Sequence, residues 1–343
     1  MTKQCPGRGV HLNGSVPLAN AESVFRTVAE RLGNDLTRMP DGETGERANW
    51  VQWQFIRVLA RHPALEPTGV KPDAYRKVGA LRVKAGATAK DLAFGPLGYA
   101  EVAKTSYAVF RRLRDAGAIG AGMRFQVALP TPIAPIGGFL APEDQVRVEA
   151  PYEQAMLAEV EAIAAAIPHR DLSIQWDCAR EFMFIEGLLQ RPADDLWGWL
   201  GERIARQGAA VPRDVELGFH LCYGDRGHKH FVQPKDTGNL VAMASLAAQR
   251  VRRSIEFLHL PVPRDRTDDA YFAPLKQLQL HPETRLFLGL VHLTDGLEGA
   301  RRRMAAASRF MPDYGVSTEC GLGRRPAETI VPLLDLLAEV SRL

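Results

Sequence analysis

Glu216-Leu217-Gly218-Phe219-His220-Leu221-Cys222-Tyr223-Gly224-Asp225 is the segment around which the other parts of the chain can be placed. Apolar residues run through it and a Gly-Asp turn signal ends it, which predicts a β-strand. Side chains two positions apart on a strand share one face, so His220 and Cys222 project the same way where the strand ends. An imidazole and a thiolate on one face supply half of a tetrahedral zinc site.

Seven further segments have the apolar runs and turn signals of strands: 9–16, 36–39, 124–129, 172–177, 253–258, 286–292 and 315–318. Helical patterns follow most of them, the clearest at 20–32, 142–167, 237–249, 297–309 and 326–340. Strands that alternate with helices predict parallel βα units, and eight such units fit a closed (β/α)₈ TIM barrel. A doubly wound open sheet is the alternative, but no G-x-G-x-x-G turn follows the first strand.

Polar side chains gather at the carboxyl ends of the predicted strands. They are Ser15, Asp41, Glu43, Thr131, Asp177, His220, Cys222, Glu256, His292 and Cys320. In TIM-barrel enzymes this end of the barrel carries the active site. The strand pattern and the placement of polar residues therefore predict the same architecture.

Two of these groups supply the remaining metal ligands. Glu256 lies in Ser254-Ile255-Glu256 on the predicted sixth strand, and Cys320 follows the eighth. Together with His220 and Cys222 they make four ligands of the types that zinc takes, and mixed thiolate, imidazole and carboxylate ligation favours zinc over magnesium or calcium. Ligands spread between positions 220 and 320 are typical of a catalytic site in a barrel rather than of a structural zinc site.

Composition is that of an ordinary globular protein. The chain has 343 residues, of which 46% are hydrophobic and 24% charged, and a formal net charge of +3. We expect one domain over 1–343, with a Pro- and Gly-rich excursion at about 63–95. The small, scattered basic excess gives no nucleic-acid signal, and no apolar run is long enough for a transmembrane helix. The N-terminus lacks the apolar core of a signal peptide, so we expect a cytoplasmic protein.

Some polar residues have plainer interpretations. We expect the run Arg301-Arg302-Arg303 to be a solvated helix face. Cys5 and Cys178 are expected to behave as small apolar residues. His228 and His230 are expected to be exposed loop residues, with a second site as the alternative.

Three segments resemble, in the same order, the zinc-ligand segments of cobalamin-independent methionine synthase: His-Leu-Cys at 220–222, Ser-Ile-Glu at 254–256 and Glu-Cys-Gly-Leu-Gly-Arg at 319–324. The resemblance implies that His220, Cys222, Glu256 and Cys320 bind zinc. Asn13-Gly14-Ser15-Val16-Pro17 is similar to the family's first-strand motif, which implies that Ser15 holds a substrate carboxylate. Ile174-Gln175-Trp176-Asp177 is similar to the segment whose aspartate contacts the substrate amino group.

The loop from Asp41-Gly42-Glu43 through Arg47 is similar to the family's second-strand loop, which makes Glu43 and Arg47 candidate substrate-binding residues, with Arg47 as a group that could hold an anion. The family also differs from this sequence. Gln52 falls where a family glutamate helps to bind the amino group, so Gln52 is a further candidate substrate-binding residue, which with Ser15 and Asp177 would orient the thiol. Asp177-Cys178-Ala179 replaces the family's Asp-Glu-Pro. His292 lies about two positions from the expected acid. The resemblance covers one of the two barrels of the full-length enzyme.

These features predict zinc-dependent transfer of a methyl or alkyl group to a substrate thiol, with His292 as the acid for the leaving group. The expected partners are a small-molecule thiol and an alkyl donor, for which a folate is one candidate, while a homo-oligomer is left open. Three alternatives stay open: addition of a thiol to an epoxide, a metal-free barrel related to uroporphyrinogen decarboxylase, and a non-catalytic zinc-binding protein.

Overall fold

The computed structural model of the protein describes residues 8–69, 79–224 and 229–343, and its main feature is a curled sheet of parallel strands. In spatial order the seven strands within this described part are β1 (Arg38–Pro40), β4 (Arg124–Pro130), β5 (Leu172–Cys178), β6 (Glu216–Leu221), β7 (Phe257–Pro261), β8 (Arg285–Val291) and β9 (Gly315–Thr318). β5 is buried along its whole length, as expected for a parallel strand covered on both faces.

The segment before the first helix lies between the two edge strands of this sheet. Val10 forms parallel bridges with both Leu36, just before β1, and Val316 in β9. The His11 N–H donates to the Val316 carbonyl at 3.0 Å, and the Val10 N–H donates to the Asp35 carbonyl at 2.7 Å. The first predicted strand is therefore an extended segment with short pairing. Because it joins the two edges, the fold is TIM-barrel-like rather than a doubly wound open sheet.

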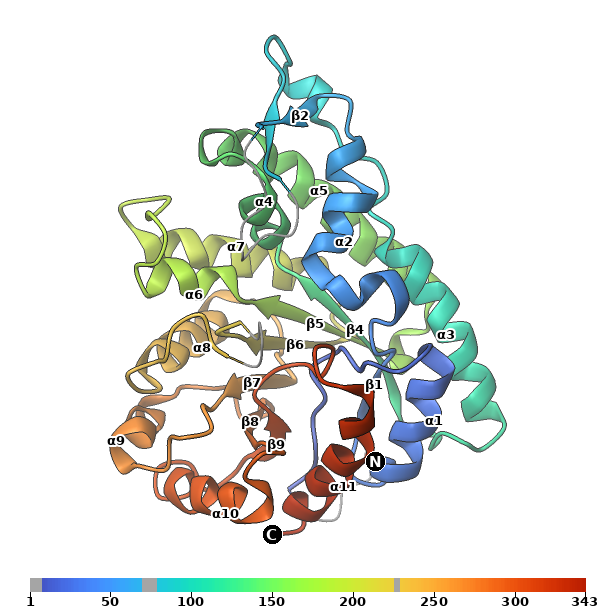
Figure 1. Ribbon diagram of the computed structural model, residues 1–343, viewed down its shortest axis with the longest axis vertical. Coiled ribbons are helices and arrows are strands. Elements are labelled where there is room, and N and C mark those ends of the chain that lie inside the picture. The colour runs from blue at the N-terminus through green and yellow to red at the C-terminus, as the bar shows by residue number, and fades with distance from the viewer. Residues whose placement is uncertain (1–7, 70–78, 225–228) are drawn as a thin grey trace.

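Helices surround the strands (Figure 1). In the described residues they are α1 (Ala21–Leu32), α2 (Trp50–Arg57), α3 (Tyr99–Asp115), α4 (Ile133–Phe139), α5 (Pro142–Ala166), α6 (Arg180–Ile185), α7 (Leu196–Ala210), α8 (Gly238–Arg250), α9 (Asp269–Phe272), α10 (Gly296–Ala307) and α11 (Ile330–Ser341). α1 begins after Asn20, whose side chain accepts from the Ser23 N–H at 2.9 Å and so caps the helix. No helix of the described residues is long and apolar enough to cross a membrane.

A small separate sheet lies within the predicted excursion. β2 (Leu65–Pro67) and β3 (Leu81–Val83) pair in antiparallel fashion, and residues 70–78 between them lie outside the described residues. Figure 1 shows β2 at one end of the molecule, beyond α2 and away from the main sheet. Leu81 also bridges to Leu140 after α4, which ties this sheet to the helical layer.

The sixth strand differs from the prediction. β7 begins at Phe257 and ends at Pro261, whereas the prediction placed the strand at 253–258. The guanidinium group of Arg253 donates to the carbonyl oxygens of Val211 and Val215, at 2.9 and 2.6 Å, so the chain is held at the start of the strand.

The arginine run on α10 is also not uniformly solvated. Arg301 and Arg302 are exposed, but Arg303 is fully buried. Its guanidinium group donates to both carboxylate oxygens of Asp295, at 2.6 and 2.9 Å, and to the Leu290 carbonyl at 2.8 Å. A buried arginine is tolerated here because its donors are paired.

Candidate metal centre

The structure brings together three of the four predicted ligands. Ligand atoms of His220, Cys222 and Cys320 all lie within 4.8 Å of one another. Cys320 Sγ is 3.5 Å from Cys222 Sγ and 3.5 Å from His220 Nε2. His220 lies near the carboxyl end of β6, Cys222 directly follows that strand, and Cys320 follows β9. The group therefore lies at the carboxyl end of the strands, as the sequence predicted.

The surroundings favour a thiolate at Cys222. The hydrogen bond with Cys320 lowers the pKa of the Cys222 thiol well below its usual value, and His220 lowers it further, although burial acts in the opposite direction. The Gly224 N–H also donates to Cys222 Sγ at 3.2 Å. Two sulfur atoms and an imidazole nitrogen are the soft and borderline donors that zinc takes, and three protein ligands are the usual number in a catalytic zinc site. The residues present thus fit a zinc ion.

The predicted place of Glu256 is wrong. It precedes β7, at the amino-terminal end of the sheet and away from the cysteines. Its carboxylate accepts from the Leu217 N–H at 2.6 Å and from the Ser254 hydroxyl, and Arg253 lies 3.4 Å away. The later start of β7 moves the Ser-Ile-Glu segment to the opposite end of the strand from the one predicted.

The metal-ligand group of His220, Cys222 and Cys320 has two buried carboxyl groups in its surroundings. Asp177 lies next to it, and Glu43 lies near Asp177. Asp177 pairs with His220 across β5 and β6, and burial raises the pKa of its carboxyl to about 7. Its Oδ1 accepts from Gln175 Nε2 at 2.7 Å. Burial and the nearby carboxyl of Asp177 raise the pKa of Glu43 well above its usual value. Glu43 has a φ of 51°, a left-handed conformation rare for residues other than glycine, which adds backbone strain at this position.

Arg47 lies in the same loop as Glu43, and Ser15 forms a bridge with Gly42 beside it. Arg47 donates to Asp41 Oδ2 at 2.6 Å, and both line a small cavity with Glu43. Ser15 Oγ accepts from the Gly323 N–H at 3.1 Å, so the first extended segment contacts the Cys320 loop. Gln52 is half-buried on α2 and does not line that cavity.

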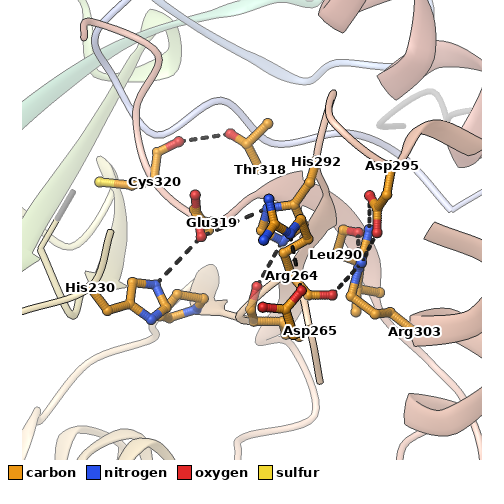
Figure 2. A network of polar contacts seen from close by, with 12 residues as sticks. His230, Arg264, Asp265, Leu290, His292, Asp295, Arg303, Thr318, Glu319 and Cys320 are labelled. Atoms are coloured by element: carbon orange, nitrogen blue, oxygen red, sulfur yellow. Dashed lines mark hydrogen bonds and ion pairs between the residues drawn. The ribbon is translucent and has the colours of Figure 1, made fainter. Parts of the chain in front are cut away.

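Figure 2 shows Glu319 between the imidazole rings of His230 and His292. Glu319 Oε2 is 3.7 Å from His230 Nε2 and 3.8 Å from His292 Nδ1. The side chain of His230 is only 2% exposed, which corrects the expectation of a solvated loop residue, while His228 and Cys5 lie outside the described residues.

His292 is buried and donates from Nε2 to the Val262 carbonyl at 2.9 Å. Burial lowers the pKa of its imidazole to about 3, with the nearby Arg303 acting in the same direction. His292 is therefore neutral near pH 7, with Nδ1 free of a proton and turned toward Glu319.

Sequence reasoning missed Glu319 and His259. Glu319 directly precedes a predicted ligand, and that adjacency was the available signal. His259 is a single histidine within the apolar strand β7, and its Nδ1 lies 2.7 Å from His220 Nδ1. His259 could have been noticed as a histidine close to the predicted sixth strand. Because that strand was predicted to end at 258, His259 was not placed opposite His220.

No protein-family model matches the sequence, and no curated protein is significantly similar to it. Solved structures do match. A Listeria monocytogenes protein assigned as a vitamin-B12-independent methionine synthase is 13% identical, with a TM-score of 0.59 over 99% of this chain and 98% of its own. A B12-independent methionine synthase from Shewanella sp. W3-18-1, in complex with selenomethionine, is 14% identical, with a TM-score of 0.61 over 97% of this chain and 96% of its own.

A methyltransferase from Methanosarcina mazei is also 14% identical, with a TM-score of 0.53 over 99% of this chain and 95% of its own. At these identities the similarity establishes the architecture, and the family resemblance inferred from the sequence agrees with it at that level. The chain has the fold of B12-independent methionine synthase-like and methyltransferase structures.

Proposed function

We propose that this protein is a zinc-dependent enzyme that transfers a methyl or alkyl group to a substrate thiol. The observation that carries the proposal is the group of His220, Cys222 and Cys320, at the end of the sheet where barrel enzymes hold their active sites. The shared fold with methionine synthase-like structures supports the same reaction class.

His220, Cys222 and Cys320 would hold the zinc ion. A bound zinc ion lowers the pKa of a thiol that coordinates it, so that a thiolate is present at neutral pH. The substrate sulfur would attack the donor carbon: the sulfur–carbon bond would form, the bond from carbon to the donor would break, and the leaving group would take that electron pair and a proton. His220, Cys222 and Cys320 make three protein ligands, and a catalytic zinc site with three protein ligands would bind the substrate thiol as a further ligand.

We infer that the thiol substrate carries a positively charged amino group. Asp177 and Glu43 are buried carboxyl groups. Burial raises both pKa values, and the positive charges nearby are too few to lower them again. An ammonium group placed between them would lower both pKa values and supply the missing charge. Ser15, on the neighbouring segment, would orient the other end of the same substrate. Arg47 is paired with Asp41, so we assign it a role in holding the Asp41 loop as well as in attracting an anion.

Protonation of the leaving group is assigned to His292 with Glu319 beside it. Because burial keeps His292 neutral and its Nε2–H is bonded to the Val262 carbonyl, the proton for the leaving group would enter and leave at Nδ1. Glu319 Oε2 lies 3.8 Å from this Nδ1 and 3.7 Å from His230 Nε2, so Glu319 is the carboxyl group that would have to move closer to exchange the proton.

Zinc content of the purified protein tests the metal centre. We expect about one zinc per chain in the wild type and a loss of most of it in Cys222→Ala and Cys320→Ala, measured by inductively coupled plasma mass spectrometry. Cys178→Ala is the matched control, because Cys178 is buried nearby but lies outside the group. A wild type that holds no zinc after reconstitution, or full zinc in both variants, would contradict the proposal.

An assay of catalytic turnover distinguishes an enzyme from a protein that only binds zinc. Homocysteine, cysteine and a thiol without an amino group would be incubated with methyl donors that include a methylated folate, and thioether formation would be followed by mass spectrometry. We expect zinc-dependent alkylation of an aminothiol, and a lower rate in Asp177→Asn through a higher KM. Zinc binding without alkylation of any thiol would leave only a metal-binding role.

A further inference from the structure

His259 occupies an unusual place beside the metal-ligand group. It is fully buried on β7, directly opposite His220 on β6, and their ring centroids are 4.7 Å apart. Both of its nitrogen atoms have a close partner. Nε2 lies 3.0 Å from the carbonyl oxygen of Thr318, and Nδ1 lies 2.7 Å from His220 Nδ1.

These partners determine where the protons lie. A carbonyl oxygen can only accept, so His259 Nε2 must carry a hydrogen. A neutral imidazole has one N–H group, which leaves His259 Nδ1 as an acceptor. The single hydrogen that fits between the two Nδ1 atoms is therefore donated by His220. His220 then has a lone pair at Nε2, the atom that lies 3.5 Å from Cys320 Sγ.

We propose that His259 is a positioning residue, which holds His220 in the tautomer whose Nε2 can bind the metal. The proposal rests on the proposed zinc centre and assigns a role within it. Metal-bound histidines commonly donate their second N–H to a carboxylate or a backbone carbonyl. Here a second histidine stands between the ligand and the carbonyl oxygen of Thr318.

The same contacts join the two ligand-bearing parts of the chain. Thr318 ends β9, two residues before Cys320, and its hydroxyl donates to the Cys320 carbonyl at 2.7 Å. His259 thus links β6, which carries His220, with the strand end that carries Cys320. Both nitrogen atoms of His259 are engaged in this link, which makes it a support for the ligands rather than a ligand itself.

Zinc affinity tests the proposal, measured by competition with a chelating dye at fixed pH. We expect His259→Leu to weaken zinc binding about 10- to 100-fold, the usual effect of losing such a partner. His259→Asn should recover much of the affinity, because its side-chain oxygen can accept from His220 Nδ1. His11→Leu is the matched control: His11 is also buried inside the barrel, but its Nε2 contacts Gln175 at 2.8 Å.

A second readout is independent of whether the leucine variant folds. Long-range ¹H–¹⁵N spectra of zinc-free wild-type protein, labelled at histidine, should show His220 protonated at Nδ1 and His259 at Nε2. The His220→Gln spectrum would identify the His220 signals. A His220 protonated at Nε2 in the wild type would overturn the proposal.

The affinity outcomes are equally decisive. Unchanged affinity in His259→Leu would overturn the proposal. Loss of zinc as complete as in Cys320→Ala, without recovery in His259→Asn, would also overturn it by making His259 a ligand. If the wild type itself binds no zinc, the proposed function fails, while the tautomer spectra still report whether His259 sets the proton position.

Discussion

Buried carboxyl groups near the candidate metal centre have raised pKa values, so they are expected to make the stability of the fold depend on pH. Glu181 on α6 is 3% exposed, and burial raises the pKa of its carboxyl from 4.5 to about 7. A carboxyl with a raised pKa in the folded state stabilises the fold fully below pH 4.5, and this contribution is lost as the pH rises through 7. Ionisation of Glu181 therefore opposes folding at pH 8.

We expect Glu181→Gln to raise the free energy of unfolding at pH 8 by about 3 kcal/mol, since one pKa unit corresponds to about 1.4 kcal/mol. The difference from the wild type should shrink toward zero near pH 4. Thermal unfolding followed by circular dichroism between pH 4 and 8 measures this effect. Glu202→Gln, on the exposed face of α7, is the control and should show no such trend. Equal melting temperatures of Glu181→Gln and wild type at pH 8 would contradict the prediction.

Among single residues, the sequence predicted functional side chains correctly where the residue type alone indicates metal binding. His220, Cys222 and Cys320 could be named as a group because few other functions need these side chains at strand ends. Glu256 was misplaced because its position depended on a strand boundary, which residue chemistry does not determine. The burial of His230 could not be predicted, because it depends on a partner far away in the sequence, Glu319. Arg303 pairs with Asp295 only eight positions away, but the run of three arginines does not indicate which of them faces inward.

At the scale of the element, the start of α3 depends on one side chain from another helix. The carboxylate of Glu159, in α5, accepts from the N–H groups of Leu97, Gly98 and Ala100 at 2.5, 2.9 and 2.5 Å. These groups lie at the helix N-terminus, where backbone donors lack partners within the helix. The negative charge also interacts favourably with the helix dipole.

Replacement of Glu159 by Gln should lower the free energy of unfolding by about 2 kcal/mol, since buried donors lose a charged acceptor. Chemical denaturation measures the change, and hydrogen exchange should show faster opening of the first turn of α3. Glu161→Gln lies on the exposed face of the same helix and should stay within about 0.5 kcal/mol of the wild type. A loss no greater than that of the control would show that the contact is not stabilising.

Most helices could be predicted from the sequence because they have clear signals at their ends. The predicted helix at 20–32 and the observed α1 differ by one residue, and the prediction at 142–167 differs from α5 likewise. β7 was less predictable because a parallel strand that is buried on both faces is a continuous apolar run, which has no alternation to fix its ends. The tether between Arg253 and the carbonyl oxygens before β6 sets the start of β7, and it connects residues about 40 positions apart.

For the whole molecule, an ion-pair network at the amino-terminal end of the strands joins parts of the sheet that are not neighbours. Glu216 on β6 accepts from Arg38 on β1 at 2.6 Å and lies 2.8 Å from Arg124 on β4. Arg38 is largely buried. This network crosses the interior of the barrel, while the candidate metal centre lies at the other end.

Glu216→Gln should lower the free energy of unfolding by about 3 kcal/mol, because it leaves the buried charge of Arg38 without its partner. Urea denaturation followed by tryptophan fluorescence and by circular dichroism would measure this loss of stability. The unfolding transitions seen by the two methods should still coincide. Glu283→Gln, at an exposed position, is the control. The double variant Arg38→Met with Glu216→Leu should recover part of the loss. A single variant as stable as the control would exclude the network as a support of the barrel.

The barrel-like architecture could be predicted because it follows from the alternation of strands and helices, which is a property of the whole chain. The closure of the sheet could not be predicted in detail. The first segment contributes bridges at Val10 rather than a full strand, and its pairing depends on the two edges that it joins. Periodicity in a short segment carries no information about such distant partners.

The positions of the two cysteines in the metal-ligand group have a consequence for synthesis of the protein. Cys222 and Cys320 are 98 positions apart, so the ribosome makes β7, β8, β9 and the helices between these strands before it reaches Cys320. The strand that precedes Cys320 also bridges to Val10, which is made before either cysteine. A nascent chain therefore has no complete set of ligands until its last strand has emerged. The proposed zinc ion would therefore find all three of its protein ligands only after Cys320 has been made and β9 has paired with the rest of the sheet.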